Sequence, residues 1–172
     1  CLLSRGLGDV YKRQEILEIP PNSQGIYALA ALGVLNYLPI AKMDSVDFFH
    51  YQIEAMKLGF KLCQNLIADP DCNQIRYDDL LDPNSLCNYA AQITHEAQSS
   101  SYTFQDDSKD TVYLAAADKA GLMVSFIQSN YLGFGSGVVI KDTGIALHNR
   151  GAGFSLDPSS PNVVGPRKRP FH

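Results

Sequence analysis

Cysteine is scarce in this sequence, and basic residues are outnumbered by acidic ones. There are four cysteines in 172 residues, and the spacings among Cys63, Cys72 and Cys87 match no zinc-binding pattern. Four scattered cysteines do not make a disulfide framework either, so we expect reduced thiols, no metal and no other cofactor. The 14 Lys and Arg residues against 18 Asp and Glu leave a formal net charge of −4, which argues against a nucleic-acid partner. We expect a cytoplasmic compartment and no membrane partner.

Two stretches that suggest a ligand lack what that ligand requires. The sequence Gly-Phe-Gly-Ser-Gly at residues 133–137 has neither the lysine nor the following helix of a phosphate-binding loop, which argues against a nucleotide role. A tight chain path explains these glycines better. The basic cluster Arg167–Arg169 is not interleaved with aromatic residues, which favours a surface cluster over a nucleic-acid patch.

The chain also lacks an initiating methionine. Residues 1–14 follow neither a helical nor a strand period, and Val10–Gln14 resembles a translated sequencing adapter, so we set this leader aside. An alternative makes Cys1 an N-terminal nucleophile, but Leu2–Gly8 does not continue as a convincing core strand. With 45% hydrophobic and 19% charged residues, the chain can bury a core either as one domain or as a piece of a larger one.

The first predicted helix follows a pair of prolines that hold the chain extended. Asn22 or Ser23 caps it, and it ends before Pro39. Apolar residues recur along it at helical spacing. They are Ile26, Leu29, Ala30, Gly33, Val34 and Tyr37. We expect this face to pack in the core and assign it no catalytic role.

Two more helices follow the first. The second opens at Asp44-Ser45 and ends at Asp69-Pro70, and its apolar stripe is more typical of a core face than of a cofactor site. The stripe consists of Val46, Phe49, Ile53, Met56, Phe60, Cys63 and Ile67. The third runs over residues 83–97 with Asp82 as its cap. Its inward residues are Leu86, Ala90, Ile93 and Ala97.

The remainder of the chain predicts strands and glycine loops. Residues 111–118 form a strand that turns through 119–121 and returns over 122–128, since short loops containing glycine join antiparallel strands. Many small residues in the first strand indicate a strand covered on both faces. Two shorter strands fit 138–140 and 145–147. With helices before the strands, the fold class is α+β.

Thr111 lies where a polar stretch changes to this strand. The preceding residues 99–109 have little to bury, which indicates an exposed and flexible segment. Cleavage between Asp110 and Thr111 would release an α-amino group beside the threonine hydroxyl, and an amine with a pKa near ~8 is suited to remove the hydroxyl proton at neutral pH. An N-terminal-nucleophile hydrolase needs this arrangement. The alternative is a capped loop that enters a sheet.

Short motifs in a fixed order extend this interpretation. They are Pro20–Gly25, Glu54-Ala55, Thr111–Tyr113, Ala117–Gly121, Gly133–Gly137, Asp142–Gly144, His148–Gly151 and Pro166–Pro170. Together they resemble the landmarks of the γ-glutamyltranspeptidase family from about Glu15 to His172, with the greatest likeness to the branch that contains oxamate amidohydrolase and transpeptidase-like hydrolases. The resemblance implies a piece of the αββα sandwich of N-terminal-nucleophile hydrolases. It also implies that residues 15–110 end the large subunit and 111–172 begin the small, catalytic one.

The resemblance assigns roles to individual positions. Thr111 falls on the family nucleophile, so the cleavage site is the Asp110–Thr111 bond. Ser129 falls where a hydroxyl supports the amine of the nucleophile. Three positions depart from the typical substrate-binding pattern: Tyr131 replaces an asparagine, Arg150 a glutamine, and Gly153 the aspartate that binds the α-ammonium of a γ-glutamyl group.

The function that the resemblance implies is a self-processing amide hydrolase. Its substrate is expected to be a small acid amide, cleaved through an acyl-enzyme, and its partner is the remainder of its own proenzyme. The oxyanion glycines and the carboxylate-binding arginine of the family are expected outside residues 1–172, so this segment alone is expected to be inactive. The alternatives are glutathione hydrolysis with γ-glutamyl transfer, or a non-enzymatic remnant that acts as a binding or structural module.

Overall fold

The structure, a computed structural model, describes residues 16–40, 44–63, 66–72, 76–99 and 111–172. The chain divides into two compact units. The helical unit comprises Cys1–Thr103 together with Phe154–His172, and the hairpin unit comprises Phe104–Gly153. The mixture of helices and strands confirms the α+β class predicted from the sequence.

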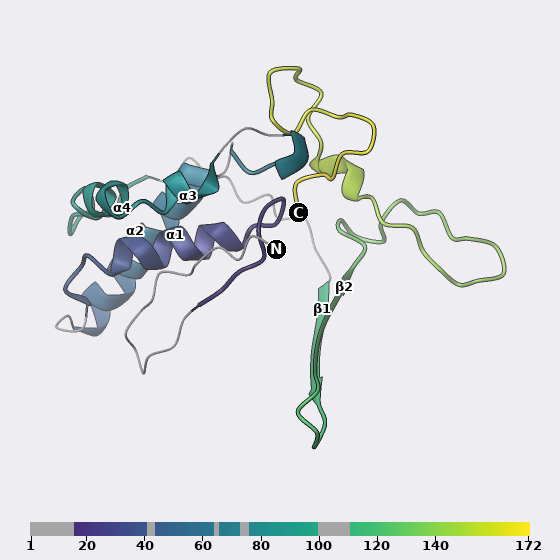
Figure 1. Cartoon of the computed structure of the whole chain (residues 1–172), viewed down its shortest axis with the longest axis horizontal. Helices are drawn as coiled ribbons and strands as arrows, with labels where there is room; N and C mark the ends of the chain where they lie inside the picture. Colours follow the sequence, from purple (N-terminus) through teal and green to yellow (C-terminus); the bar gives the residue numbers. More distant parts are fainter. Residues whose placement is uncertain (1–15, 41–43, 64–65, 73–75, 100–110) are drawn as a thin grey trace. The chain divides into compact units, whose positions relative to one another are not determined.

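Helix α1, Gly25–Leu35, occupies the centre of the helical unit beside α2, Ser45–Cys63 (Figure 1). The inward residues predicted for α1 are buried, except Tyr37, which lies beyond the helix and is 44% exposed. The predicted cap is wrong, because the N-cap is Gln24, which makes no side-chain capping bond. Asn22 and Ser23 bond instead to backbone carbonyls at Pro170 and Ile19.

Helix α2 begins as predicted but ends earlier. The carboxylate of Asp44 accepts the amides of Val46 and Asp47, both at 3.0 Å, which caps the first turn. The helix ends at Cys63 rather than Asp69, and the Cys63 carbonyl accepts the amides of residues 66 and 67 at 3.0 and 3.2 Å. Ile67 then enters the core without continuing the helix.

The buried face of α2 differs from the predicted stripe. Val46, Phe49 and Ile53 are 74%, 61% and 56% exposed. The buried residues are Tyr51, Glu54, Ala55, Leu58, Gly59 and Cys63. Small side chains explain the difference. A Cβ at Gly59 would lie 2.7 Å from a carbonyl oxygen of α1, so the two helices approach most closely where α2 has no side chain. The apolar period alone does not show which of two apolar faces meets α1.

Two short α-helices and the 3₁₀ helix η2, Pro70–Cys72, also belong to this unit. Helix α3, Tyr77–Leu80, has no counterpart in the predictions, whereas α4, Pro83–Ala90, has the predicted Asp82 cap, whose carboxylate accepts an amide at 2.9 Å. Helix α4 ends at Ala90 instead of residue 97. The chain beyond it also bonds to α2 side chains, with the Thr94 carbonyl 2.7 Å from His50 and the Gln98 carbonyl 2.8 Å from the ammonium of Lys57.

The core of the helical unit consists of two clusters. The first cluster comprises Ile26, Tyr27, Ala30, Cys63 and Ile67, and the second comprises Val34, Ala55, Leu58, Leu86 and Ala90. Cys63 is fully buried, as predicted, and burial raises the pKa of its thiol to about 12. Among the described residues, no helix is long and apolar enough to span a bilayer.

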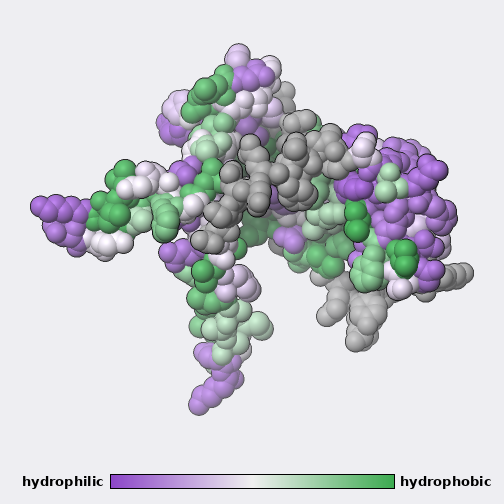
Figure 2. All heavy atoms as spheres, turned by 180° about the vertical axis from the view of Figure 1, so that it is seen from behind, coloured by the Kyte–Doolittle hydropathy of each residue, from purple (hydrophilic) through white to green (hydrophobic). Residues whose placement is uncertain are grey.

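The hairpin unit contains β1, Thr111–Ala117, and β2, Met123–Ser129, paired antiparallel from Thr111 opposite Ser129 to Ala117 opposite Met123. The predicted hairpin is therefore confirmed, and Gly121 at φ +89° makes its turn. Apolar side chains cover the hairpin, with hydrophilic residues at its tip (Figure 2). Both strands are exposed along their length, so the expected cover on both faces is wrong for the described residues.

The two shorter strands predicted after the hairpin are reduced to a single bridge. Val139 pairs with Ala146, and no ladder extends from this pair in residues 130–153. Thr143 explains the difference, because its hydroxyl donates to the Ile140 carbonyl and accepts the Ile145 amide. A side chain thus supplies turn bonds between the two segments.

Candidate functional site

Thr111 is the first residue of β1 and lies directly opposite Ser129 on β2. Residues opposite each other in an antiparallel pair place their Cβ atoms about 4.5–5.5 Å apart on the same face of the sheet. The register therefore brings the predicted nucleophile and the predicted supporting hydroxyl together. Thr111 is exposed, so its hydroxyl is accessible to a reactant. The preceding residue, Asp110, lies outside the described residues.

The Ser129 hydroxyl links the hairpin to the loop that follows. It accepts the Tyr131 amide at 2.9 Å. Tyr131 has φ +78°, a left-handed conformation that costs a bulky side chain free energy. Such a conformation persists only where the surrounding contacts hold it, and the bond to Ser129 is one of them.

Arg150 lies against Tyr131. Its guanidinium carbon is 4.9 Å from the centroid of the Tyr131 ring, which is cation–π geometry. Both residues are partly buried. Arg150 forms no ion pair within the described residues, so the guanidinium retains the capacity to bind an anion. The ring restricts its position and thereby lowers the entropy cost of binding.

Gly153 is the third residue after Arg150 in the single turn η3, Arg150–Gly153. Residues three apart eclipse one another in a 3₁₀ helix. Gly153 therefore lies on the same side of the turn as Arg150 and contributes no carboxylate there. This part of the site can bind a negative group but has no carboxylate at Gly153 to pair with an ammonium.

Asn149 is a structural residue of this site to which the sequence assigned no role. Its side-chain oxygen accepts the Leu132 amide at 3.0 Å, and its side-chain nitrogen donates to the carbonyls of Leu132 and Gly135 at 3.2 and 3.1 Å. These bonds hold the loop after Tyr131 against the segment that carries Arg150, and we call the three bonds the Asn149 bracket. The motif His148–Gly151 indicated family likeness but gave no sign of this bracket, because the partners are backbone groups.

The glycine stretch 133–137 passes through this bracket as a tight path, as predicted. Gly133, Gly135 and Gly137 have φ of +49°, +73° and +75°. A Cβ at Gly135 would lie 2.5 Å from the Leu147 carbonyl oxygen, so only glycine fits there. Within the part of the chain that the structure describes, no three His, Cys, Asp or Glu side chains are grouped to hold a metal ion.

Comparison with known proteins identifies the family. The family model for gamma-glutamyltranspeptidase matches residues 4–172. The chain belongs to the gamma-glutamyltranspeptidase family. This match includes residues 4–14, which the sequence interpretation set aside and which lie outside the described residues. The family resemblance derived from the short motifs is confirmed.

Proteins with different substrates in their names are similar to this chain. Oxamate amidohydrolase proenzyme of Klebsiella pneumoniae is 40% identical over 94% of the chain and 30% of its own length. The glutathione hydrolase-like proenzyme YwrD of Bacillus subtilis is 37% identical over 94% of the chain and 31% of its length. Cephalosporin acylase of Bacillus halodurans, a solved structure, matches with a TM-score of 0.77 and 42% identity, over 92% of the chain and 28% of its own.

These matches support the expected piece of an N-terminal-nucleophile hydrolase. The chain spans about 30% of the length of the curated relatives that it matches. Both curated relatives are named as proenzymes.

Proposed function

We propose that Thr111 is the nucleophile of a self-processing amide hydrolase to which this segment contributes the start of the catalytic subunit. The observation that carries the proposal is the register of the hairpin, which places Thr111 at the first position of β1 and opposite Ser129 in a chain of this family. Cleavage after Asp110 would make Thr111 an N-terminus. Residues 15–110 and 111–172 would then belong to two separate polypeptides.

The proposed reaction uses the two groups that Thr111 then carries. The α-amine removes the hydroxyl proton, and the hydroxyl oxygen attacks the substrate carbonyl to form an acyl-enzyme with release of the amine product. Water then hydrolyses the ester and restores the hydroxyl. Ser129, on the same face of the hairpin, is proposed to hydrogen-bond the α-amine and hold it toward the Thr111 hydroxyl.

The proposed substrate is a small amide that carries a carboxylate. Arg150 can bind a carboxylate with two parallel hydrogen bonds, and the Tyr131 ring restricts the guanidinium that does so. Gly153 offers no partner for the α-ammonium of a γ-glutamyl group. Burying that ammonium without a carboxylate costs several kcal/mol. Oxamate and other acyl amides without a free amine fit these features.

Glutathione hydrolysis with γ-glutamyl transfer is the second candidate, because one similar protein is named glutathione hydrolase-like. The ratio of kcat/KM for oxamate to that for a γ-glutamyl anilide separates the two candidates. We expect the full-length proenzyme to prefer the acid amide, and Arg150→Gln to lower kcat/KM for it by roughly 10- to 100-fold, since charged hydrogen bonds contribute about 1.5–3 kcal/mol.

A control variant separates this effect from a general loss of positive charge. Lys141 is exposed in the same unit, so Lys141→Gln removes the same charge without touching the Arg150–Tyr131 pair and should leave the kinetics unchanged. Efficient γ-glutamyl turnover that Arg150→Gln does not alter would contradict the acid-amide proposal and favour glutathione hydrolysis.

The partner of the hairpin is proposed to be the remainder of the proenzyme. Val112, Tyr113 and Met123 are 65%, 61% and 79% exposed on strands that carry few polar side chains. Contiguous apolar surface of this kind marks an interface rather than a face in contact with water. Strand edges and faces supplied by the rest of the protein would cover it.

A further inference from the structure

The segment Phe154–His172 follows Thr111 in sequence but belongs to the helical unit, whose other residues all precede the proposed cleavage site. We infer that Asp69 and Arg169 form a buried tie that holds the two polypeptides together after cleavage. This inference rests on the proposed function for the cut itself. The contact itself does not require the cut, because it is present in the continuous chain, where it joins residues 100 positions apart.

The buried carboxylate of Asp69 binds both the backbone and the side chain of Arg169. It is 1% exposed, and its two oxygens accept the Arg169 backbone amide at 2.7 Å and the guanidinium at 2.6 Å. The hydrogen bonds from Arg169 hold the pKa of Asp69 well below its usual range. The carboxylate is therefore charged at neutral pH, and both of its oxygens are used on one residue of the segment.

Further contacts dock the same segment at other points. The Asn162 side chain donates to the Ile67 carbonyl at 2.5 Å. The Asn22 side chain donates to the Pro170 carbonyl, and the Asn22 carbonyl accepts the His172 amide at 3.1 Å. Phe171 packs against the first core cluster. The segment thus contacts residues that precede α1 and residues that follow α2, and Asp69 supplies the buried charge in this interface.

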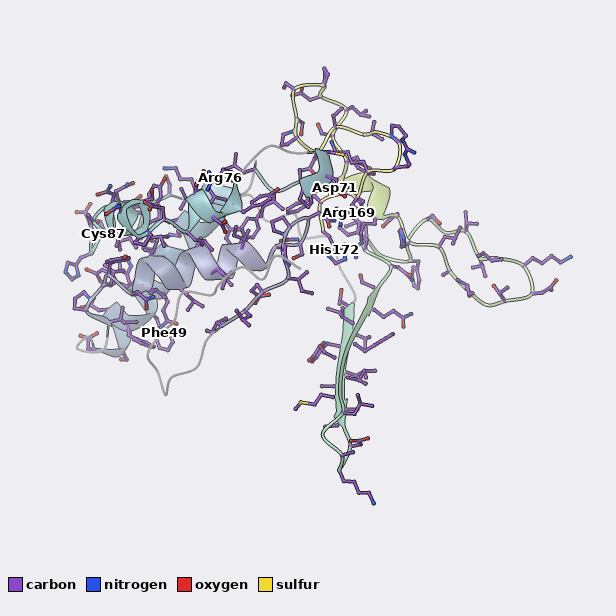
Figure 3. The ribbon with its side chains drawn as sticks, viewed as in Figure 1. Phe49, Asp71, Arg76, Cys87, Arg169 and His172 are labelled. Carbon is purple, nitrogen blue, oxygen red and sulfur yellow. The ribbon has the colours of Figure 1, made fainter. Side chains whose placement is uncertain are left out.

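The neighbouring carboxylate provides a matched control. Asp71 also accepts the guanidinium of Arg169, at 2.9 Å, but its side chain is 85% exposed against 2% for Asp69. Figure 3 shows Arg169 beside Asp71. Exposed ion pairs contribute little because water and salt screen them, whereas breaking a buried pair leaves an uncompensated charge. The same Asp→Asn change at the two positions therefore separates the buried tie from general electrostatics.

The test measures the dissociation constant between the piece that ends at Asp110 and the piece that begins at Thr111. One arm uses the self-cleaved, full-length proenzyme with a tag on its first piece, diluted in a urea series before capture on the tag. A second arm expresses the two full-length pieces together as separate chains split at the same bond, so that the tie is tested even where self-cleavage fails.

The expected order of effects follows from burial. Arg169→Gln leaves Asp69 buried without its cation and should weaken association by about 100-fold. Asp69→Asn leaves the half-exposed guanidinium of Arg169 paired with the exposed Asp71 alone and should weaken association by about tenfold. Asp71→Asn should stay within about threefold of wild type. Where Arg169→Gln yields no soluble protein, the comparison of the dissociation constants of Asp69→Asn and Asp71→Asn decides whether the buried pair holds the pieces together.

The outcomes distinguish the tie from the proposed function. Equal dissociation constants for Asp69→Asn and Asp71→Asn, with the pieces cut and active, would overturn the tie and leave the function standing. A wild-type chain that stays uncut, together with the expected order in the split arm, would overturn the cleavage proposal and leave the tie standing. Two separate chains dissociate further on dilution. A dissociated fraction that does not change with protein concentration would therefore also contradict a tie between separate chains.

Discussion

The substitution Asn149→Ala tests whether the bracket around Arg150 shapes the proposed substrate site. The change removes three hydrogen bonds of 3.0–3.2 Å to the backbone of Leu132 and Gly135. A net contribution of about 1 kcal/mol for each bond gives about 3 kcal/mol, and partial exposure of the residue reduces this to about 2 kcal/mol. A loss of that size in the bound state lowers kcat/KM for the acid amide by roughly 30-fold.

The assay is steady-state kinetics on the full-length proenzyme after cleavage. Because Asn149 holds the segment that carries Arg150, the proposed substrate ligand, and has no proposed role at the reacting bond, KM should rise and kcat should change little. Thr143→Ala is the control, since it removes two side-chain bonds to the backbone from the neighbouring turn and should leave KM unchanged. An unchanged KM for Asn149→Ala, or an equal rise for Thr143→Ala, would refute the bracket.

Three further predictions follow from the helical unit. In chemical denaturation, Gly59→Ala should lower the unfolding free energy by about 1–3 kcal/mol, because its Cβ would lie 2.7 Å from a carbonyl oxygen of α1. Gly151→Ala is the control, since a Cβ there meets no atom within 4 Å and the unfolding free energy should not change. In the native protein at pH 8 an alkylating reagent should label the exposed Cys72 and spare Cys63, whose pKa is raised to about 12 by burial; labelling of Cys63 at the same rate would contradict its burial. The pKa of Asp69 is lowered in the folded protein, so the paired carboxylate stabilises the fold above about pH 4 and this contribution is lost as the pH falls further. The loss of unfolding free energy in acid should therefore be smaller in Asp69→Asn than in the wild type.

Local patterns predicted the elements whose bonds are local. The hairpin with its glycine turn and the cap of Asp82 follow from residues within a few positions of one another, and both are present in the structure. Helix ends were less predictable. Helix α4 stops at Ala90 because the chain beyond it bonds to His50 and Lys57, more than 40 positions earlier, and a helical period carries no signal of such partners.

The residues of the candidate site also divide into those that the sequence indicated and those that depend on distant contacts. Family likeness indicated Thr111, Ser129 and Arg150, and the register of the hairpin then showed that Thr111 lies opposite Ser129. The bracket of Asn149 and the burial of Asp69 depend on contacts 14 to 100 positions apart. Arg169 was expected in a surface cluster, and its side chain is 52% exposed, but its guanidinium also reaches the buried Asp69. Composition does not distinguish a solvated basic cluster from one with a buried acidic partner.

Intact mass and N-terminal sequencing of the purified full-length proenzyme test the central claim most directly. The account predicts two polypeptides, the second beginning with Thr111, and a single uncut chain without amidase activity for Thr111→Ala. Ser129→Ala, which removes the hydroxyl opposite Thr111 on the hairpin, should slow the appearance of the second polypeptide. A wild-type chain that remains uncut while folded and active, or a new N-terminus at any residue other than Thr111, would contradict the assignment of the nucleophile.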